Sequence, residues 1–210
     1  ISTFSRPDGY MRLVLTRGKG PLGIDPGRCG RPTMFILADK LSVFDDGKRA
    51  DGADLIIAST RRLSPDSLDP RIKSLNYLNH ILARIEANAA GADEAVLLNG
   101  EGRIAEGTAD NVFIVRNDVL QTPPCTDGAL AGVTRNVVME LAEELGIPCR
   151  KCSLAPYDLH TADACFLSGT GTELMPVSSV DGRRMKQCPG RVFEAIEQAF
   201  RTLIRRECSK

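Results

Sequence analysis

The sequence lacks an excess of charge of either sign. Its 210 residues carry 27 Lys and Arg against 27 Asp and Glu, so the formal net charge is zero. Without a basic surplus there is no bulk field that attracts nucleic acid, and no nucleic-acid partner is expected. No apolar run comes near the roughly 18 residues of a membrane helix, so no membrane span is expected. Repeats and low-complexity stretches are absent as well.

Motifs for metal binding and for a catalytic triad are also missing. The seven cysteines are odd in number and lack the spacing of a disulfide framework, which favours a reducing, cytoplasmic location. Cys149 and Cys152 form one C-x-x-C, but no second pair completes four zinc ligands, so no metal site is expected. His80 and His160 stand in no arrangement typical of a triad, and both are expected to be structural or surface residues.

The N-terminal residues suggest that the sequence is a fragment, because it starts at Ile1 rather than Met. They show no basic segment that leads into an apolar stretch, so no signal peptide is expected. Apolar residues other than glycine make up 42% of the chain. Together with the 19 glycines they reach about half, which is the globular norm and permits a core.

Strand and helix patterns are mixed along the chain without strict alternation, which predicts an α+β fold. The residues of Tyr10–Thr16 alternate as in a strand, with Tyr10 and Arg12 on one face. Further strands are predicted at residues 33–38, 53–60, 94–99, 111–115, 164–168 and 176–180, and apolar residues at helical spacing predict helices around residues 137–145 and 192–203.

One further helix is predicted after a polar loop, ending at Gly91. Its apolar stripe is expected to lie in the core and consists of Leu75, Leu78, Leu82 and Ile85. Earlier in the chain, the turn-rich residues 45–52 indicate a domain boundary between about residues 38 and 50. We therefore expect a small domain at residues 1–40 and a large domain at residues 41–210.

Lys73 is a candidate for Schiff-base chemistry. It lies between a polar loop and the start of a helix, in Arg71-Ile-Lys-Ser-Leu-Asn-Tyr-Leu78. A lysine that reacts with a carbonyl cofactor needs a partly buried amine, and Ile72 and Leu75 supply apolar neighbours in the sequence. The alternative is a solvated surface lysine.

Glu106 is a candidate partner for a pyridine nitrogen. It precedes a glycine in Ala105-Glu-Gly-Thr-Ala-Asp-Asn-Val-Phe113. Pyridoxal chemistry needs a carboxylate that keeps the ring nitrogen protonated, so that the ring can accept electrons. The alternative is a solvated carboxylate in a turn.

Two glycine-containing turns are candidate anion sites. Gly132-Val-Thr134 leads into a predicted helix, whose first N–H groups and positive dipole end suit a phosphate. Thr134 could instead only cap that helix. Ser168-Gly-Thr-Gly-Thr-Glu173 follows a predicted strand and can form a nest of backbone N–H groups around an anion, or an ordinary tight turn.

These segments, in this order, resemble those of the class IV aminotransferases, enzymes of fold type IV that use pyridoxal 5'-phosphate (PLP). The motifs are Lys73-Ser-Leu-Asn-Tyr77, Glu106-Gly-x-x-x-Asn111, Gly132-Val-Thr-Arg135 and Ser168-Gly-Thr170. The resemblance covers nearly the whole chain and is strongest to prokaryotic branched-chain amino acid aminotransferases. It implies a fold like that of D-amino acid aminotransferase, with a large PLP-binding domain at 41–210 and the remnant of a small N-terminal α+β domain at 1–40.

The resemblance also implies which residues hold the cofactor. Lys73 would form the Schiff base with PLP and move the proton at the substrate Cα. Tyr77 would bind the ring hydroxyl, and Glu106 would pair with the ring nitrogen. The phosphate would be held by Val133, Thr134 and Thr170.

Substrate-binding residues follow from the same resemblance. The backbone groups of Thr170 and Gly171 would face the substrate carboxylate. Tyr10 would help to bind the α-carboxylate, and Arg12 would receive the side-chain carboxylate of glutamate. Without the family, Tyr10 and Arg12 could equally form the polar outer face of an edge strand.

The implied activity is amino transfer from L-leucine, L-isoleucine or L-valine to 2-oxoglutarate, by a homodimer in amino-acid biosynthesis. D-amino acid aminotransferase and aminodeoxychorismate lyase, of the same fold, are alternatives. Leu22 and Ile24 stand where the D-enzyme carries a carboxylate-binding pair, which counts against that enzyme. The family's first segment, with an arginine that clamps the phosphate, is absent here, so a truncated, non-catalytic fragment is a further alternative.

Overall fold

The computed structural model describes residues 9–40 and 46–208. The chain divides into two compact units, Ile1–Val43 and Phe44–Lys210. Each unit is described by itself. In the described part of the chain, no helix has both the length and the apolar character needed to cross a membrane.

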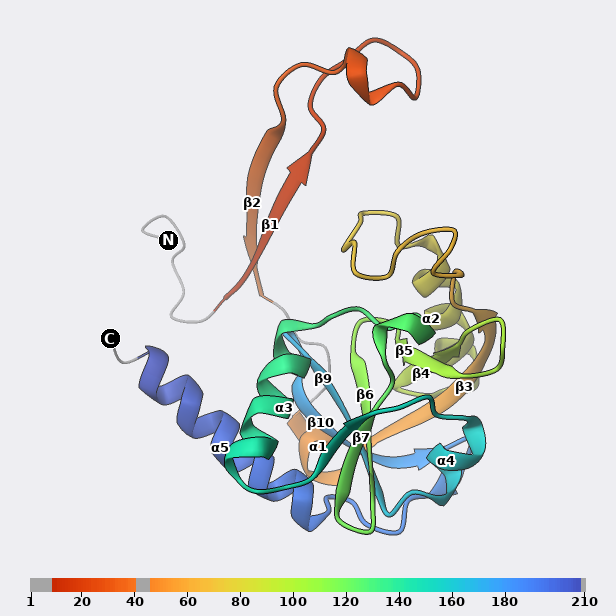
Figure 1. The fold of residues 1–210 in the computed structure, drawn as a ribbon, viewed down its shortest axis with the longest axis vertical. Helices are drawn as coiled ribbons and strands as arrows, with labels where there is room; N and C mark the ends of the chain where they lie inside the picture. Colours follow the sequence, from red (N-terminus) through yellow and green to blue (C-terminus); the bar gives the residue numbers. More distant parts are fainter. Residues whose placement is uncertain (1–8, 41–45, 209–210) are drawn as a thin grey trace. The chain divides into compact units, whose positions relative to one another are not determined.

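The first unit is built on an antiparallel hairpin (Figure 1). Strand β1 (Tyr10–Thr16) pairs with β2 (Thr33–Asp39), and Arg12 lies opposite Leu37. The loop between the strands contains the 3-10 helix η1 (Pro26–Arg28), which Asp25 caps through its side chain. Both strands predicted in this part of the chain are confirmed.

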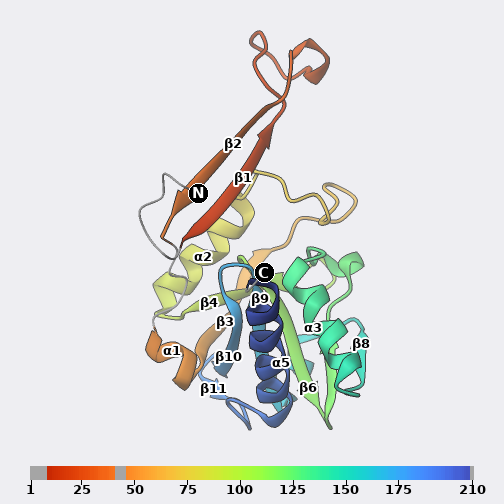
Figure 2. The ribbon, with the colours of Figure 1, turned by 90° about the vertical axis from the view of Figure 1, so that its left-hand side faces the viewer.

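The second unit is organised around a mixed sheet (Figures 1 and 2). The strand order is β5-β4-β3-β10-β9-β6-β7-β8, and β11 pairs with β10. Parallel pairs are β3 with β4, β3 with β10 and β7 with β8, and the other pairs are antiparallel. The strands are β3 (Ala53–Arg61), β4 (Glu94–Leu98), β5 (Ile104–Gly107), β6 (Asn111–Arg116), β7 (Val119–Thr122), β8 (Cys149–Lys151), β9 (Ala164–Gly169), β10 (Glu173–Val180) and β11 (Arg183–Arg184).

Helices cover the sheet and complete the second unit. They are α1 (Asp46–Asp51), α2 (Leu78–Ala90), η2 (Cys125–Asp127), α3 (Val133–Glu144), α4 (Pro156–Thr161) and α5 (Arg191–Cys208). Helices α3 and α5 lie side by side, as both views show (Figures 1 and 2). The α+β class expected from the mixed patterns is confirmed.

Strand β6 separates two hydrophobic clusters because successive side chains of a strand point to opposite faces. Phe113 and Val115 belong to the cluster that includes Val138 of α3 and Ile196 of α5. The intervening residues of β6 belong to a second cluster with Leu154 and Leu159, and they are Val112 and Ile114. Both faces of β6 are therefore buried, which explains its continuous apolar run.

Helix α2 packs on the sheet through small residues, and the expectation that its Leu and Ile stripe lies in the core was wrong. Ala83 and Ala87 are fully buried against Ala58, Ala95 and Leu97. The opposite face of the helix is solvent-exposed and comprises Leu78 (62%), Ile81 (51%), Leu82 (46%) and Ile85 (56%), with Leu75 (68%) on the loop before it. Periodicity defines an apolar face, but alanines allow the closer approach of the helix to the sheet.

Glu86 fixes α2 to the end of β3. Its Oε1 accepts hydrogen bonds from the backbone N–H (2.9 Å) and the hydroxyl of Thr60 (2.5 Å). Its Oε2 accepts from the backbone N–H (2.7 Å) and the hydroxyl of Ser59 (2.6 Å). These four donors lower the pKa of Glu86 to about 2, with the hydroxyls as the main cause.

The predicted helices and strands correspond to elements of the structure, with shifted ends. Helix α3 begins at Val133, before the apolar spacing that predicted it. Helix α2 ends at Ala90, and Gly91 caps it in the left-handed conformation with φ 70°. Several short elements of two to six residues were not predicted, because such lengths hold too little periodicity. They are α1, β5, β7, α4 and β11.

Candidate active site

Glu106 is a buried carboxylate with three hydrogen-bond donors. It lies on β5 opposite Leu97 and is 5% exposed. Its Oε1 accepts from Nε of Arg62 (3.0 Å) and contacts Nε2 of His80 (3.1 Å), and its Oε2 accepts from the N–H of Leu130 (2.7 Å). The alternative of a solvated turn carboxylate is therefore wrong.

His80 presents its imidazole edge to this carboxylate. Because a carboxylate only accepts hydrogen bonds, Nε2 of His80 carries the hydrogen in the neutral tautomer that fits this contact. Nδ1 of His80 is buried and has no partner within the described residues. The ring also stacks on Tyr77, with a centroid distance of 4.5 Å and an interplanar angle of 22°.

Lys73, Tyr77 and Glu106 line one pocket, which Arg62, His80 and Leu130 help to form. Lys73 stands on the irregular segment before α2, and its Nζ lies 5.9 Å from the centroid of the Tyr77 ring. Its side chain is exposed, as are Ile72 (58%) and Leu75 (68%). Ile72 and Leu75, its apolar neighbours in sequence, therefore do not cover the Lys73 amine within the described residues.

The turn before α3 is fixed to the Glu106 segment from two sides. Leu130 donates its N–H to Glu106, and its carbonyl accepts from Nδ2 of Asn111 (2.9 Å). A Cβ added to Gly132 would come within 2.2 Å of Oδ1 of Asn111, so only glycine fits there. The Gly132 turn and the Glu106 motif, 26 residues apart in sequence, therefore form one local structure.

Helix α3 begins at this turn without a side-chain cap. Its N-cap is Gly132, with φ −65° and ψ 140°, and no side chain bonds to the first amides. Thr134 lies within the first turn and is 8% exposed, so the alternative that its side chain caps the helix is wrong. The first N–H groups of a helix have no intrahelical partner and form its positive end. Such a start can receive a phosphate on the amides of Val133 and Thr134.

Thr170 and Gly171 form the tip of a hairpin turn. The pairing of Gly169 with Glu173 leaves three residues between β9 and β10, and Glu173 adopts the left-handed conformation with φ 58°. Thr170 is exposed and Gly171 is half-buried. A left-handed residue at the end of a three-residue turn is a common hairpin geometry.

Asp110 directly precedes β6, between the Glu106 strand and this hairpin. It is 5% exposed, and its Oδ1 accepts a hydrogen bond from Oγ1 of Thr172 (2.5 Å). Burial is the main cause that raises the pKa of Asp110 to about 7, and the charges of Glu94 and Glu106 add to it.

Tyr10 and Arg12 belong to the first unit, so the structure does not place them relative to this pocket. They lie two residues apart on β1, which puts both side chains on one face, as predicted. Arg12 is exposed and Tyr10 is half-buried.

Arg62 and His80 are the site residues that the sequence did not indicate. His80 was expected to be structural or a surface residue, yet it contacts the carboxylate that stood out as a candidate. Its one available signal was position, since it follows Tyr77 by about one helical turn. Arg62 is 44 residues from Glu106 in sequence, and nothing local to it pointed to this contact.

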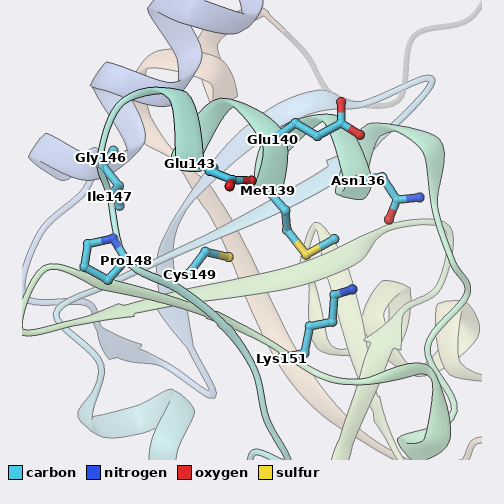
Figure 3. A pocket seen from close by; sticks show the side chains of 9 residues that line it. All are labelled: Asn136, Met139, Glu140, Glu143, Gly146, Ile147, Pro148, Cys149 and Lys151. Carbon is cyan, nitrogen blue, oxygen red and sulfur yellow. The ribbon is translucent and has the colours of Figure 1, made fainter.

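A second hollow, of about 720 Å³, lies between α3 and β8 and contains none of the predicted site residues (Figure 3). Met139 and Glu143 of α3 line one side, and Cys149 and Lys151 of β8 line the other. Burial raises the pKa of the Cys149 thiol. Cys149 and Cys152 are both free thiols.

The family described as amino-transferase class IV matches residues 2–180. The chain belongs to this family. Its fold is that of fold type IV, since it is 35% identical to the branched-chain amino acid aminotransferase of Escherichia coli with a TM-score of 0.89, over 93% of this chain and 65% of that one.

Two further comparisons agree with this membership of the class IV aminotransferases. The chain is 48% identical over 200 residues to a putative branched-chain-amino-acid aminotransferase of Methanocaldococcus jannaschii, covering 93% of this chain and 67% of the relative. It is 32% identical to the branched-chain amino acid aminotransferase of Thermobaculum terrenum in its PLP form, with a TM-score of 0.84 over 93% of this chain and 64% of that one. This class IV aminotransferase chain therefore spans about two thirds of the length of the proteins it matches.

Proposed function

We propose that this chain carries the PLP site of a transaminase that moves the amino group of L-leucine, L-isoleucine or L-valine to 2-oxoglutarate. The observation that carries the proposal is the pocket that joins Lys73 to a buried carboxylate, Glu106, with donors on both carboxylate oxygens. Three relatives named as branched-chain aminotransferases support the substrate class.

The residues of the pocket fit PLP. Glu106 already receives hydrogen bonds from Arg62, His80 and Leu130, which fix its orientation. An ionised carboxylate is the partner that a protonated pyridine nitrogen requires. The uncapped start of α3, held by Asn111 through Leu130, supplies the amides for the phosphate.

When bound, PLP supplies an electron sink for the pair of electrons left on the substrate Cα. Lys73 would hold the cofactor and move the proton at the substrate Cα. Tyr77 would orient the cofactor ring by binding the hydroxyl of that ring. The amides of Val133 and Thr134, with Thr170, hold the phosphate. Glu106 keeps the ring nitrogen protonated while Arg62 and His80 hold the carboxylate in place.

Substrate recognition is assigned to two further groups. Thr170 and Gly171 present backbone N–H groups to the substrate carboxylate. Tyr10 helps to bind the α-carboxylate, and Arg12, two residues along β1, receives the side-chain carboxylate of the glutamate product. The D-amino acid and lyase activities are the alternatives, and D-alanine and aminodeoxychorismate test them beside L-leucine.

A homodimer is supported by the exposed face of α2. Leu78, Ile81, Leu82 and Ile85 are each 46–62% exposed on one side of this helix. A contiguous apolar face of this kind is typical of an interface between subunits. The small-domain remnant at residues 1–40, the large domain at 41–210 and the cytoplasmic location stay predictions.

The test is the absorbance spectrum of the purified protein with PLP, before and after addition of L-leucine. We expect a cofactor band that is lost with L-leucine, is unaffected by D-alanine and returns with 2-oxoglutarate. Lys73→Ala is expected to remove this response, whereas Lys151→Ala, an exposed lysine on β8, is expected to retain it. A normal response in Lys73→Ala would contradict the assigned role, and a response to D-alanine alone would favour the D-amino acid activity.

A further inference from the structure

We propose that Asp110 is a positioning residue that anchors the hairpin tip Thr170–Thr172 through Thr172, and so sets the affinity for the substrate carboxylate. This inference rests on the proposed function of Thr170 and Gly171. It assigns a role to a buried acid that the proposed transamination chemistry leaves unused.

The anchor is a single buried hydrogen bond at the base of the tip. Thr172 is 2% exposed, and its hydroxyl donates to Oδ1 of Asp110 (2.5 Å). Thr170 and Gly171, by contrast, are exposed and half-buried. The hydrogen bond of the Thr172 side chain therefore limits the motion of Thr170 and Gly171.

Gly169 shows how closely Asp110 lies against the hairpin. Asn111 pairs with Ser168 at the end of the β6–β9 ladder, so Asp110 and Gly169 stand one residue beyond this last pair. A Cβ at Gly169 would lie 2.4 Å from Oδ1 of Asp110 and 3.3 Å from the carbonyl oxygen of Ala109. The Asp110 carboxyl group therefore fills the space that a side chain at position 169 would take, and from there it reaches the hydroxyl of Thr172.

The same residue also closes the turn after Glu106. The carbonyl of Asp110 accepts a hydrogen bond from the N–H of Gly107 (2.7 Å). Asp110 thus connects the strand that carries the Glu106 carboxylate to the hairpin that carries the substrate-binding tip. A shift of either segment is transmitted to the other through this residue.

An asparagine at position 110 could accept the same hydrogen bond from Thr172 without the cost of burying an ionisable group. The presence of an aspartate here therefore calls for an explanation. Oδ2 of Asp110 is buried and unpartnered within the described residues. Glu94 of β4 and Glu106 of β5 raise the pKa of Asp110, and Arg84 of α2 lowers it, with burial as the largest cause. A pKa of about 7 means that the acceptor of Thr172 gains charge as the pH rises through neutrality. A charged acceptor makes a stronger hydrogen bond, so the tip is held more tightly above pH 7.

The experiment compares Thr172→Val, which removes the hydroxyl at nearly constant shape, with Thr172→Ser, which restores it. We expect Thr172→Val to raise KM for L-leucine and 2-oxoglutarate about tenfold, the loss of one hydrogen bond to a charged group, with kcat changed less than about threefold. Thr172→Ser and the surface control Thr202→Val, on α5, are expected to stay near the wild type. The cofactor absorbance is expected to be unchanged in all of them.

A second readout does not depend on catalysis. Hydrogen exchange of the backbone amides of residues 169–173, measured without substrate, is expected to be about tenfold faster in Thr172→Val. Asp110→Asn, which keeps the acceptor but cannot ionise, is expected to make the protection factors of these amides, the intrinsic rates divided by the measured rates, independent of pH between pH 6 and 8. Wild-type exchange and KM in Thr172→Val would overturn the inference, as would loss of activity that Thr172→Ser does not restore.

The proposed function and this inference fail in different ways. If the wild type shows no response to amino acids, the proposed function fails. Hydrogen exchange in the wild type and Thr172→Val then still tests whether the Thr172–Asp110 bond holds the hairpin tip. If the wild type transaminates and Thr172→Val exchanges at the wild-type rate, the function stands and the anchor is wrong.

Discussion

Nε of Arg62 lies 3.0 Å from Oε1 of Glu106, and both side chains are less than a tenth exposed. The same Nε also donates to the carbonyl of Gly128 (3.2 Å). This ion pair joins the residue after β3 to β5, across β4, which lies between these strands in the sheet. It orients the carboxylate that we assign to the cofactor.

Arg62→Met is expected to lower the free energy of unfolding by about 3–5 kcal/mol, because it leaves the Glu106 carboxylate buried without its ion-pair partner. Urea unfolding measures the change. Arg61→Met, at the adjacent exposed position on β3, is the control and is expected to cost less than about 1 kcal/mol. Equal stability of the two variants would contradict the expected cost of leaving Glu106 buried without Arg62.

His80→Leu is expected to weaken PLP binding about tenfold, since it removes one hydrogen-bond donor to the Glu106 carboxyl group and leaves only Arg62 and Leu130 to orient it. Absorbance titration with PLP gives the dissociation constant. His160→Leu serves as the control, because His160 contacts Asp181 (3.5 Å) rather than the candidate site. Unchanged affinity in His80→Leu would exclude a positioning role for this imidazole.

Asp110 is expected to make the protein less stable as the pH rises from about 4 to about 7. Its folded pKa of about 7 exceeds the unfolded value near 3.8, so the folded state binds more protons in this window. Stability is fully retained below pH 4 and falls by up to a few kcal/mol by pH 7.

Urea unfolding of Asp110→Asn at pH 5 and pH 8 isolates this contribution from the other titrating groups. The unfolding free energy of Asp110→Asn minus that of the wild type is expected to be more positive at pH 8 than at pH 5. Asp66→Asn, at an exposed loop position, controls for the change of charge. A constant difference between wild type and Asp110→Asn at the two values would contradict the raised pKa.

Leu82→Glu is expected to convert the proposed homodimer into monomers, because it introduces a charge into the exposed apolar face of α2. Sedimentation velocity at micromolar concentration measures the change in mass. Leu145→Glu, at an exposed leucine after α3, is expected to leave the association unchanged. A wild-type protein that sediments as a monomer would contradict the proposed interface.

Local elements were predictable because their signals are local. The short apolar run within residues 111–115 and the helical spacing before Gly91 correspond to β6 and α2, since a strand buried on both faces and a helix with one apolar face each leave a local pattern in the sequence. The order of the motifs around Lys73 and Glu106 likewise indicated the family. Two candidate residues, Tyr10 and Arg12, were correctly predicted to share a face of one strand.

The tertiary structure alone decided how these elements use their faces. The Leu and Ile stripe of α2 is exposed because alanines on the other face pack against β3 and β4. No feature near Arg62 or His80 indicates Glu106, which lies 44 and 26 residues away in sequence. The sequence determined the strands, helices and chemical groups available, because backbone preferences act over a few residues. Which groups meet depended on the strand order β5-β4-β3-β10-β9-β6, since sheet pairing joins segments far apart in the chain.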